Sequence, residues 1–308
     1  MTGPSTGSLR VNGATLYYEV RGRGPLLLLI PGGGGDTASF DGVADDLAAS
    51  YTVATYDPRG MSRSTLDDPD AEQSVAQHAE DAFRLVELLS PAAPARVFGA
   101  SSGAITALHL LTAHPGRFAR VVAHEPPVVE VLPDAAEHRA LVARVTETLR
   151  TRGLVLAMGV FAAGLRKAGE PAGPGPGADT ALPPRAAARR ERTMANLPYF
   201  VGSIVPRFMA YVPDVDRLEA LTDRLLLAGG RDSRGELPYR AAAFLAERLN
   251  TPLRLFPGGH TGLTTHPEEF GELLRKALAD PSRIRGRSGS GADDRRGPTG
   301  RGSRWMGP

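Results

Sequence analysis

The sequence contains no cysteine among its 308 residues, which excludes disulfide bonds, thiolate catalysis and cysteine-based metal sites. Long apolar runs are missing as well. The most apolar window, Gly153–Leu165, is too short to cross a bilayer, and Met1–Arg10 has no apolar signal-peptide segment. We therefore expect a cytoplasmic protein without a membrane partner.

Motifs for bound groups are also missing. No stretch matches the phosphate-binding pattern Gly-x-x-x-x-Gly-Lys-Ser/Thr. Several histidines show neither the spacing of two histidines on one helix face nor a carboxylate pattern that would indicate a metal. These are His78, His109, His114, His138 and His266. We expect no metal site and no cofactor.

The residues that are present, 42% hydrophobic and 23% charged, are ordinary for a globular protein. Their charge is unevenly distributed, because residues 281–308 contain seven Arg against two Asp and leave 29 basic and 32 acidic residues for the rest. This Arg/Gly-rich tail has almost no apolar residue, so we expect it to be disordered. Since the basic charge belongs to the tail, we expect no nucleic-acid partner for the body.

Strand-like and helical patterns alternate along the chain. Leu9–Val11 and Ala14–Tyr18 flank an Asn-Gly turn typical of a hairpin, and Leu26–Ile30 is continuously apolar, as in a parallel sheet covered by helices. Further strands are predicted at 52–56, 96–99, 119–123, 224–228 and 253–256, and helices at 40–49, 74–89, 102–113 and 239–249. This order predicts an α/β protein with a mostly parallel, doubly wound sheet and an N-terminal antiparallel hairpin.

One segment interrupts the alternation. Residues 133–214 contain only helical patterns and a Pro/Gly-rich loop at 170–184, so we expect a helical cap on top of the sheet. The core domain would then comprise residues 1–132 and 215–280. Near its end, at 197–212, the cap carries a stripe of aromatic and aliphatic residues that either joins the core or lines a substrate pocket. The pocket candidates in this stripe are Tyr199, Phe200 and Phe208.

The pentapeptide Gly99–Gly103, with the sequence Gly-Ala-Ser-Ser-Gly, lies where a predicted strand meets a predicted helix. A Gly-x-Ser-x-Gly motif in this position is typical of a nucleophile elbow, a sharp turn that exposes the central serine above the sheet. Small residues are needed there because the strand and helix backbones approach closely. Ser101, at the centre of the motif, is therefore the candidate nucleophile rather than Ser102.

The last two predicted strands are each followed by a candidate partner of Ser101. His260 lies in a Pro-Gly-Gly-His-Thr-Gly run, and Asp232 lies in a Gly-Gly-Arg-Asp run. A histidine activates a serine hydroxyl by removing its proton, and a carboxylate holds the imidazole in the right tautomer. Ser101, Asp232 and His260 follow one another in the order that a hydrolase of this topology requires. Glu125, at the end of an earlier strand, is the alternative acid.

The oxyanion formed by such an attack needs hydrogen-bond donors, and backbone N–H groups supply them without reorganisation. One candidate is the N–H of Ser102, directly after the nucleophile. The other comes from the loop Pro31–Gly35, where we favour Gly33. Without Cβ atoms, Gly32 and Gly34 would let a substrate approach these amides, so both are pocket candidates.

Together these motifs resemble the α/β-hydrolase superfamily over residues 9–278, in particular its members with a serine nucleophile and a helical cap between the sixth and seventh strands. The run Asp57–Ser64 is similar to the D-x-R-G-x-G-x-S segment of that family, and Val121–Pro127 is similar to its sixth strand. The chain departs from the family where Ser62 replaces a glycine and Pro31 replaces a frequent histidine. The resemblance implies this fold and hydrolase chemistry, with the cap as the variable part.

The predicted function is a cofactor-independent serine hydrolase, of carboxylesterase or lactonase type. Its substrate would be a small carboxylic ester, lactone or similar acyl compound, cleaved through an acyl-enzyme intermediate. A cofactor-free haloperoxidase or perhydrolase, or a C–C hydrolase, would use the same three residues. A non-catalytic ligand-binding protein on the same fold is the alternative of another class.

A dinucleotide-binding oxidoreductase is the remaining alternative. The pattern Gly33-x-Gly35-x-x-Ala38 follows an apolar strand and precedes a helix, and Asp57 lies 22 residues after Gly35. This spacing matches the dinucleotide-binding fingerprint. It leaves the serine motif and the histidine loop without a role.

Overall fold

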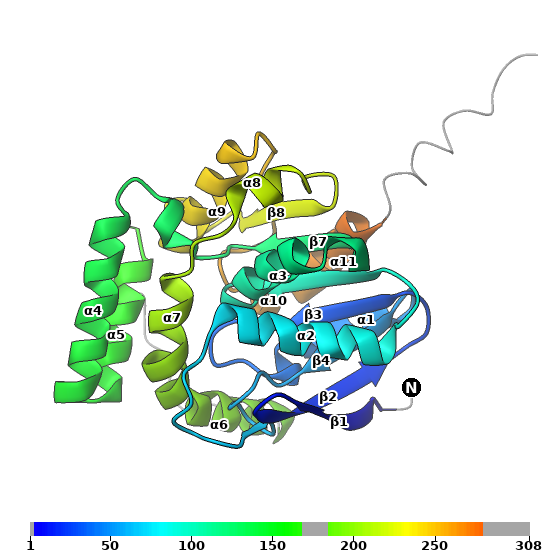
Figure 1. The fold of residues 1–308 in the computed structure, drawn as a ribbon, viewed down its shortest axis with the longest axis horizontal. Helices are drawn as coiled ribbons and strands as arrows, with labels where there is room; N and C mark the ends of the chain where they lie inside the picture. The colour runs from blue at the N-terminus through cyan, green and yellow to red at the C-terminus, as the bar shows by residue number, and fades with distance from the viewer. Residues whose placement is uncertain (1–2, 168–183, 280–308) are drawn as a thin grey trace, which may run out of the picture. The chain divides into compact units, whose positions relative to one another are not determined.

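The strands form one mixed sheet in the computed structural model, which describes residues 3–167 and 184–279 (Figure 1). Within these ranges the sheet has nine strands in the spatial order β1-β2-β4-β3-β6-β7-β8-β9, with β5 paired to β2. The strands are β1 Ser5–Val11, β2 Ala14–Arg21, β3 Leu26–Ile30, β4 Thr52–Tyr56, β5 Thr65–Leu66, β6 Ala95–Ala100, β7 Phe118–His124, β8 Leu225–Gly230 and β9 Arg254–Phe256.

The sheet is antiparallel at its N-terminal end and parallel elsewhere. β1 and β2 form the hairpin predicted around the Asn-Gly turn, with Val11 opposite Ala14, and β2 is also antiparallel to β4 and β5. From β4 through β3, β6, β7 and β8 to β9, every pair is parallel. The predicted doubly wound α/β sheet with an N-terminal hairpin is confirmed.

Helices cover both faces of the sheet, because parallel neighbours need a crossover connection. The helices α1 and α11 pack on one face, whereas α2, α3 and α9 pack on the other (Figure 1). The helices of the two layers, with the short helical turns beside them, are η1 Thr37–Phe40, α1 Asp41–Ala48, α2 Val75–Leu89, α3 Ser102–Ala113, η2 Pro115–Arg117, α9 Leu237–Arg248, α10 Gly262–Thr265 and α11 Pro267–Leu278.

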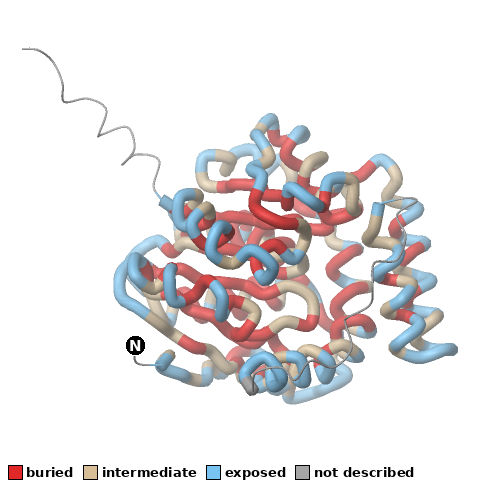
Figure 2. The backbone as a smooth tube through the Cα atoms, turned by 180° about the vertical axis from the view of Figure 1, so that it is seen from behind, coloured by how far each residue is buried: buried red, intermediate tan, exposed pale blue. Residues whose placement is uncertain are grey.

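The two helix layers enclose two separate hydrophobic cores with the sheet between them. Strand β3 is buried over its whole length. Its even-numbered residues pack into the core under α2 and α3, and its odd-numbered residues pack into the core under α1 and α11. Figure 2 shows this burial as a continuous red centre beneath exposed helix surfaces. The unbroken apolar run in the sequence therefore reflects burial on both faces.

Between β7 and β8, the described part of the chain contains only helices. They are η3 Val129–Val131, α4 Ala135–Arg152, α5 Leu154–Leu165, α6 Pro184–Tyr199, the π-helix η4 Phe200–Ile204, α7 Val205–Met209 and α8 Val215–Glu219. We call α4, α5, α6, η4 and α7 the cap helices. Because the two-residue β5 was not predicted, β7 and β8 correspond to the sixth and seventh predicted strands, 119–123 and 224–228.

Two predicted segments fall outside the described residues. The Pro/Gly-rich loop at 170–184 lies outside them except for Pro184, which begins α6, and the tail at 281–308 lies outside them entirely. The chain divides into two units at Leu278, and the second, residues 279–308, is described only at Ala279. In the described ranges, no helix has the length and apolar character needed to span a membrane.

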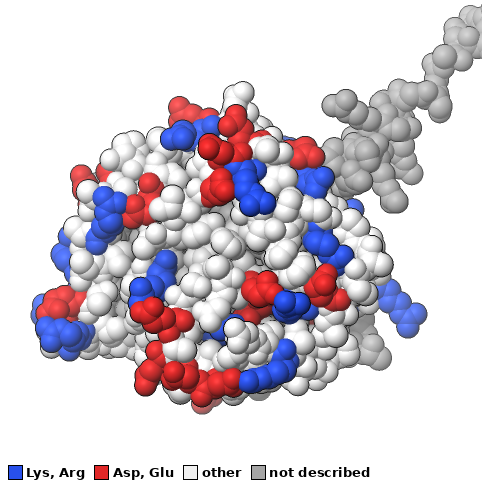
Figure 3. All heavy atoms as spheres, in the orientation of Figure 1, with Lys and Arg blue, Asp and Glu red and all other residues white. Residues whose placement is uncertain are grey.

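The surface of the described residues carries both signs of charge. On the face that Figure 3 shows, acidic and basic side chains are interspersed rather than gathered into a field of one sign. Among the described residues, Arg207 forms an ion pair with Glu72, and Arg240 forms one with Asp134. This face therefore offers no extended basic surface of the kind that follows a phosphate backbone.

Two histidines are buried in the cores beside aromatic rings. His78 of α2 lies edge-on to Phe208 with ring centroids 5.0 Å apart, and His124 at the end of β7 lies 5.3 Å from Phe270. Burial lowers the pKa of His78 to about 3, with a smaller contribution from the positive charge of Arg59. Burial likewise lowers the pKa of His124 to about 4. Both imidazoles are therefore neutral in the folded protein at neutral pH.

The stability of the fold is expected to fall in mild acid because of these two histidines. The unfolded chain protonates them below the ordinary pKa of 6.5, whereas the folded chain keeps them neutral until the pH approaches 4. Below pH 6.5 the unfolded chain binds protons that the folded chain does not bind, so the free energy of unfolding decreases as the pH falls. Above pH 6.5 both states are neutral at these histidines, and this loss is absent. Between pH 7 and pH 5 each histidine should account for a loss of about 2 kcal/mol.

Urea unfolding at pH 7 and pH 5 measures this loss. Over that interval, His78→Gln should lose about 2 kcal/mol less stability than the unsubstituted protein, because Gln does not titrate. Equal losses in the two proteins would contradict the neutral, buried state of His78.

Candidate active site

Ser101 stands at the sharp turn between β6 and α3. Its backbone has φ of 52° and ψ of −120°, a conformation that costs a non-glycine residue about 1–3 kcal/mol. Glycines make the turn possible, since a Cβ on Gly99 would lie 2.3 Å from the carbonyl oxygen of Gly103. A Cβ on Gly103 would lie 2.4 Å from the carbonyl oxygen of Ile30. The turn has the strand-to-helix geometry of a nucleophile elbow.

The ends of neighbouring strands bring two more side chains to Ser101. Parallel strands end at the same edge of a sheet, and β6, β7, β8 and β9 are neighbours in that order. His260, in the loop after β9, places Nε2 3.1 Å from Ser101 Oγ. Its Nδ1 lies 2.6 Å from Oε2 of Glu125, the residue directly after β7. Ser101, His260 and Glu125 thus form a chain of hydrogen bonds.

Glu125 is fully buried, and both of its carboxylate oxygens are bonded. Oε2 faces His260, while Oε1 accepts hydrogen bonds from the Gly230 N–H at 2.7 Å and from the Ser233 hydroxyl. Burial raises the pKa of Glu125, but the hydrogen bond and charge of His260 outweigh it, so the pKa lies below its ordinary value. The ionised carboxylate can therefore hold a proton on His260 Nδ1. No local motif marks Gly230 and Ser233, which reach Glu125 only because β8 lies beside β7.

Asp232, the acid predicted from the sequence, is not part of this chain of hydrogen bonds. Strand β8 continues two residues beyond its predicted end, to Gly230. The turn that follows leaves Asp232 exposed and buries Ser233 instead. The alternative acid, Glu125, follows β7 directly with a positive φ of 49°. The carboxylate that bonds His260 is therefore Glu125 and not, as predicted, Asp232. The order serine, carboxylate, histidine along the chain is kept.

The glycine loop, residues 32–35, follows β3 and lies against the elbow. A Cβ on Gly32 would be 2.8 Å from the Cβ of Ser101. Gly33 has φ of 56°, and its N–H donates a hydrogen bond to Ser102 Oγ at 3.0 Å. The backbone N–H of Ser102 belongs to the first turn of α3, where N–H groups have no partner inside the helix. Both predicted oxyanion donors therefore lie next to Ser101.

A cavity of about 300 Å³ opens beside Ser101 and His260. Its wall is mostly apolar, and among the described residues no Asp, Glu, Lys or Arg lines it. The cap contributes Phe161, Phe200, Ile204, Val205, Phe208 and Met209, and the core contributes Pro127, Pro238 and Leu263. The arrangement places a hydrogen-bonded serine in the wall of an apolar pocket, which suits a neutral carbonyl compound.

The pocket candidates divide into residues that line the cavity and residues that do not. Gly32, Phe200 and Phe208 are in its wall. Tyr199 packs over Gly60 instead, and burial raises the pKa of Tyr199 to about 12. Gly34 faces α6, where a Cβ would lie 3.4 Å from the Cβ of Asn196. The pocket role expected for Tyr199 and Gly34 is corrected, because α6 packs directly against the core at both points.

The helix that lines the cavity changes its winding near Pro198. This residue lies inside α6, where it cannot donate a helical hydrogen bond. The π-helix η4 follows directly, and π-turns within helices are frequent at functional sites. Phe200 and Ile204, at its two ends, both line the cavity.

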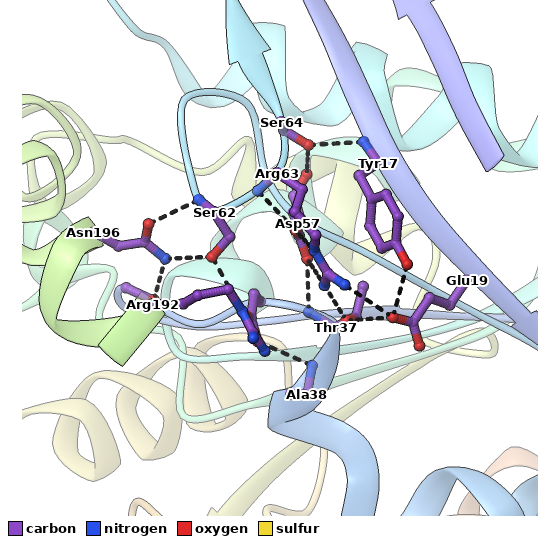
Figure 4. Close-up of polar contacts among 12 residues, drawn as sticks. Tyr17, Glu19, Thr37, Ala38, Asp57, Ser62, Arg63, Ser64, Arg192 and Asn196 are labelled. Carbon is purple, nitrogen blue, oxygen red and sulfur yellow. Dashed lines mark hydrogen bonds and ion pairs between the residues drawn. The ribbon is translucent and has the colours of Figure 1, made fainter. Parts of the chain in front are cut away.

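Asp57, which the dinucleotide alternative requires, is fully buried and bonded within the protein (Figure 4). Its carboxylate accepts from the Thr37 backbone N–H at 3.0 Å and from Nε of Arg63 at 2.7 Å. A ribose hydroxyl would have to displace these partners, so the geometry gives no support to a dinucleotide site. Within the described residues, no three His, Asp or Glu side chains are placed to hold a metal ion.

Comparisons with known proteins identify the family of this chain. The model of the alpha/beta hydrolase fold family matches residues 25–267. The uncharacterized hydrolase YraK of Bacillus subtilis (strain 168) is 34% identical over 291 residues, which cover 89% of this chain and 96% of YraK. A zearalenone hydrolase of Bionectria ochroleuca is 37% identical over 119 residues, which cover 38% of this chain and 45% of that enzyme.

Solved structures show the same fold. A thermophilic esterase from Thermogutta terrifontis superposes with a TM-score of 0.66 and 19% identity, covering 90% of this chain and all of that one. A hydrolase from Pseudomonas aeruginosa PA01 superposes with a TM-score of 0.66 and 21% identity, covering 89% and 98% of the two chains. The family match and the relationship to YraK show that this chain is a hydrolase of the α/β-hydrolase fold family.

Proposed function

We propose that the protein is a serine hydrolase in which Ser101 is the nucleophile, His260 the general base and acid, and Glu125 the residue that orients His260. The observation that carries the proposal is the chain of hydrogen bonds, with Ser101 Oγ 3.1 Å from His260 Nε2 and His260 Nδ1 2.6 Å from Glu125 Oε2. These distances suit proton transfer between a hydroxyl and an imidazole.

The first half of the proposed reaction forms an acyl-enzyme. Ser101 Oγ bonds to the carbonyl carbon of the substrate while His260 Nε2 takes the hydroxyl proton. The negative charge moves to the carbonyl oxygen, which accepts hydrogen bonds from the N–H groups of Ser102 and Gly33. Gly33 thereby exchanges its bond to Ser102 Oγ for one to the oxyanion. The bond to the leaving alcohol then breaks, and His260 protonates the alcohol oxygen.

The second half releases the acyl group. His260 takes a proton from a water molecule as the water oxygen bonds to the acyl carbon, and the oxyanion forms again at the same two amides. The bond to Ser101 breaks, His260 returns the proton to Ser101 Oγ, and a carboxylic acid leaves. Every step is an acyl transfer or a proton transfer, so the proposed mechanism uses no cofactor.

The cavity favours a neutral, largely apolar ester or lactone as substrate. An ionised group buried against an uncharged, apolar wall would be penalised by desolvation. The volume of about 300 Å³ is at the lower end for small-molecule sites. With a lactone the leaving alcohol stays in the same molecule, and the product is a hydroxy acid. Support for hydrolysis also comes from the curated relatives named zearalenone hydrolases, which match part of the chain.

A fluorophosphonate probe is expected to label the protein, because such probes react with a serine activated by a neighbouring histidine. The variant Ser101→Ala should lose both the labelling, read by in-gel fluorescence, and the hydrolysis of a neutral p-nitrophenyl ester. The matched control is Ser39→Ala, which removes another serine of the cavity wall and should retain both.

Each contrary outcome points to a different function. An unlabelled wild-type protein, or equal labelling of Ser101→Ala, would contradict the proposal and favour a non-catalytic ligand-binding protein. Labelling of Ser101 without hydrolysis of any ester or lactone would favour C–C bond hydrolysis or perhydrolase chemistry at the same residues.

A further inference from the structure

The glycine loop has no side chains with which to hold its own conformation. Its four residues, 32–35, are all glycine, and glycine is the residue with the most backbone freedom to lose. One backbone hydrogen bond, from the Gly35 N–H to the Gly32 carbonyl oxygen at 2.9 Å, closes the loop as a turn. An oxyanion donor is effective only when it is already in place, so this loop needs anchors from other segments.

One anchor comes from the cap, through Asn196 of α6. The Asn196 side chain is buried, and its Nδ2 donates to the carbonyl oxygen of Gly34 at 2.8 Å. The same Nδ2 donates to Ser62 Oγ at 2.9 Å, and Oδ1 accepts from the Ser62 backbone N–H at 2.8 Å (Figure 4). All three hydrogen bonds of this amide thus go to two core loops and none to the cap.

A second contact from the same helix face holds the residue that follows the loop. Arg192, four positions before Asn196, places Nε 2.5 Å from Oδ2 of Asp36. Asp36 is buried, accepts the hydroxyl of Ser62 at 3.1 Å, and accepts the Ala38 N–H at 3.0 Å at the start of η1. The glycine loop is therefore fixed at one end by the elbow and at the other by α6.

The backbone conformation of Ser62 gives a reason for the asparagine at position 196, which bonds it. Ser62 has φ of 51°, a left-handed conformation that is strained for a serine. The hydrogen bonds of Asn196 to both the N–H and the hydroxyl of Ser62 offset that strain. Ser62 and Asn196 are thus a matched pair, and the pair ties α6 to the glycine loop.

We propose that Asn196 is a positioning residue, which keeps the glycine loop in the conformation that aims the Gly33 N–H at the reacting carbonyl. The proposal rests on the proposed function. It differs from a general role in cap stability because Asn196 bonds the loop itself, one residue from Gly33. The same continuous helix carries Phe200 and Ile204 into the cavity, so it also links the substrate wall to the oxyanion loop.

Steady-state kinetics of Asn196→Ala with p-nitrophenyl esters of several acyl lengths test the proposal. A loosened donor should lower kcat by about 10- to 100-fold, below or near the loss for removing one oxyanion donor. The factor should be the same for each acyl length, and KM should change little, since the apolar wall is intact. Phe200→Ala, which alters that wall, should instead give losses that depend on acyl length. Arg207→Ala removes an exposed cap–core ion pair with Glu72 and should leave kcat unchanged.

The double variant Ser62→Gly/Asn196→Ala separates positioning from stability. Glycine relieves the strain at position 62, so the melting temperature should recover part of the loss seen in Asn196→Ala. The value of kcat should not recover, because the Gly34 carbonyl still has no partner on α6. Recovery of kcat along with the melting temperature, or a kcat within twofold of wild type in Asn196→Ala, would overturn the proposal.

Hydrogen exchange supplies a readout that needs no enzyme activity. In the full-length protein, the peptide covering residues 32–35 should exchange faster in Asn196→Ala, while peptides from β6 and α3 should not change. Unchanged exchange in the loop would overturn the positioning role whatever the protein hydrolyses. An unlabelled, inactive wild type whose loop nevertheless loosens in Asn196→Ala would instead contradict the proposed function alone.

Discussion

Glu125→Gln is expected to lower kcat for a neutral ester by about 10⁴-fold, the loss seen when a triad carboxylate becomes an amide. The reason lies in the three donors that surround the carboxylate: His260 Nδ1 on one side, and Gly230 N–H and the Ser233 hydroxyl on the other. Glutamine has one acceptor oxygen, and the two donors from β8 and its turn will hold it. Its NH₂ group then faces His260.

An NH₂ group at this place forces His260 into the wrong tautomer. Nδ1 must accept a hydrogen bond from it, so the ring proton moves to Nε2, which can no longer take the proton of Ser101.

Asp232→Asn should leave kcat unchanged, because Asp232 is exposed and outside this set of contacts. Steady-state kinetics of the two variants, with circular dichroism as a check on folding, measure the difference. Equal losses of kcat in the two variants, or a loss in Asp232→Asn alone, would contradict the role of Glu125 and favour Asp232 as the residue that orients His260.

Ser101→Ala and His260→Ala should each lower kcat/KM by about 10⁴-fold or more, and the double variant should be scarcely worse than either single one. The two side chains act as one unit through the 3.1 Å hydrogen bond between Oγ and Nε2, so removing either member disables the other. Kinetics of both single variants and the double variant on one ester form the required cycle. Additive losses would show that Ser101 and His260 act independently, which the proposed mechanism does not allow.

Local patterns predicted much of this site because each one reports a strand end or a tight turn. The motif around Ser101 requires small residues for the close approach of β6 and α3, and the structure shows that approach at Gly99 and Gly103. The mostly parallel sheet could also be predicted from local patterns, since an apolar run such as β3 is typical of a strand buried on both faces.

The acid shows where local patterns stop being sufficient. Glu125 and Asp232 both follow strands in the sequence, and nothing nearby in the chain indicates which way either side chain points. The choice depends on two features of the folded backbone: the positive φ of Glu125 and the extension of β8 to Gly230. These features bury Ser233 and expose Asp232.

Contacts between distant segments could not be predicted either, because residues nearby in the chain do not indicate which distant segment a side chain will meet. Asn196 and Gly34 are 162 residues apart, and an asparagine inside a polar helix gives no sign of the loop that it bonds. The pocket role expected for Tyr199 and Gly34 was wrong because the rotation of α6 against the core, which its sequence pattern does not specify, places both in the interface instead.

The sequence by itself determined the order of strands and helices, the elbow with Ser101, the glycine loop and the loop of His260, because these depend on residues close together in the chain. Only the tertiary structure decided which carboxylate reaches His260, which cap residues line the cavity and what holds the glycine loop. Those outcomes depend on the spatial order of the strands in the sheet, on the length of each strand and on the rotation of α6 against the core. These features bring together side chains that are far apart in the sequence.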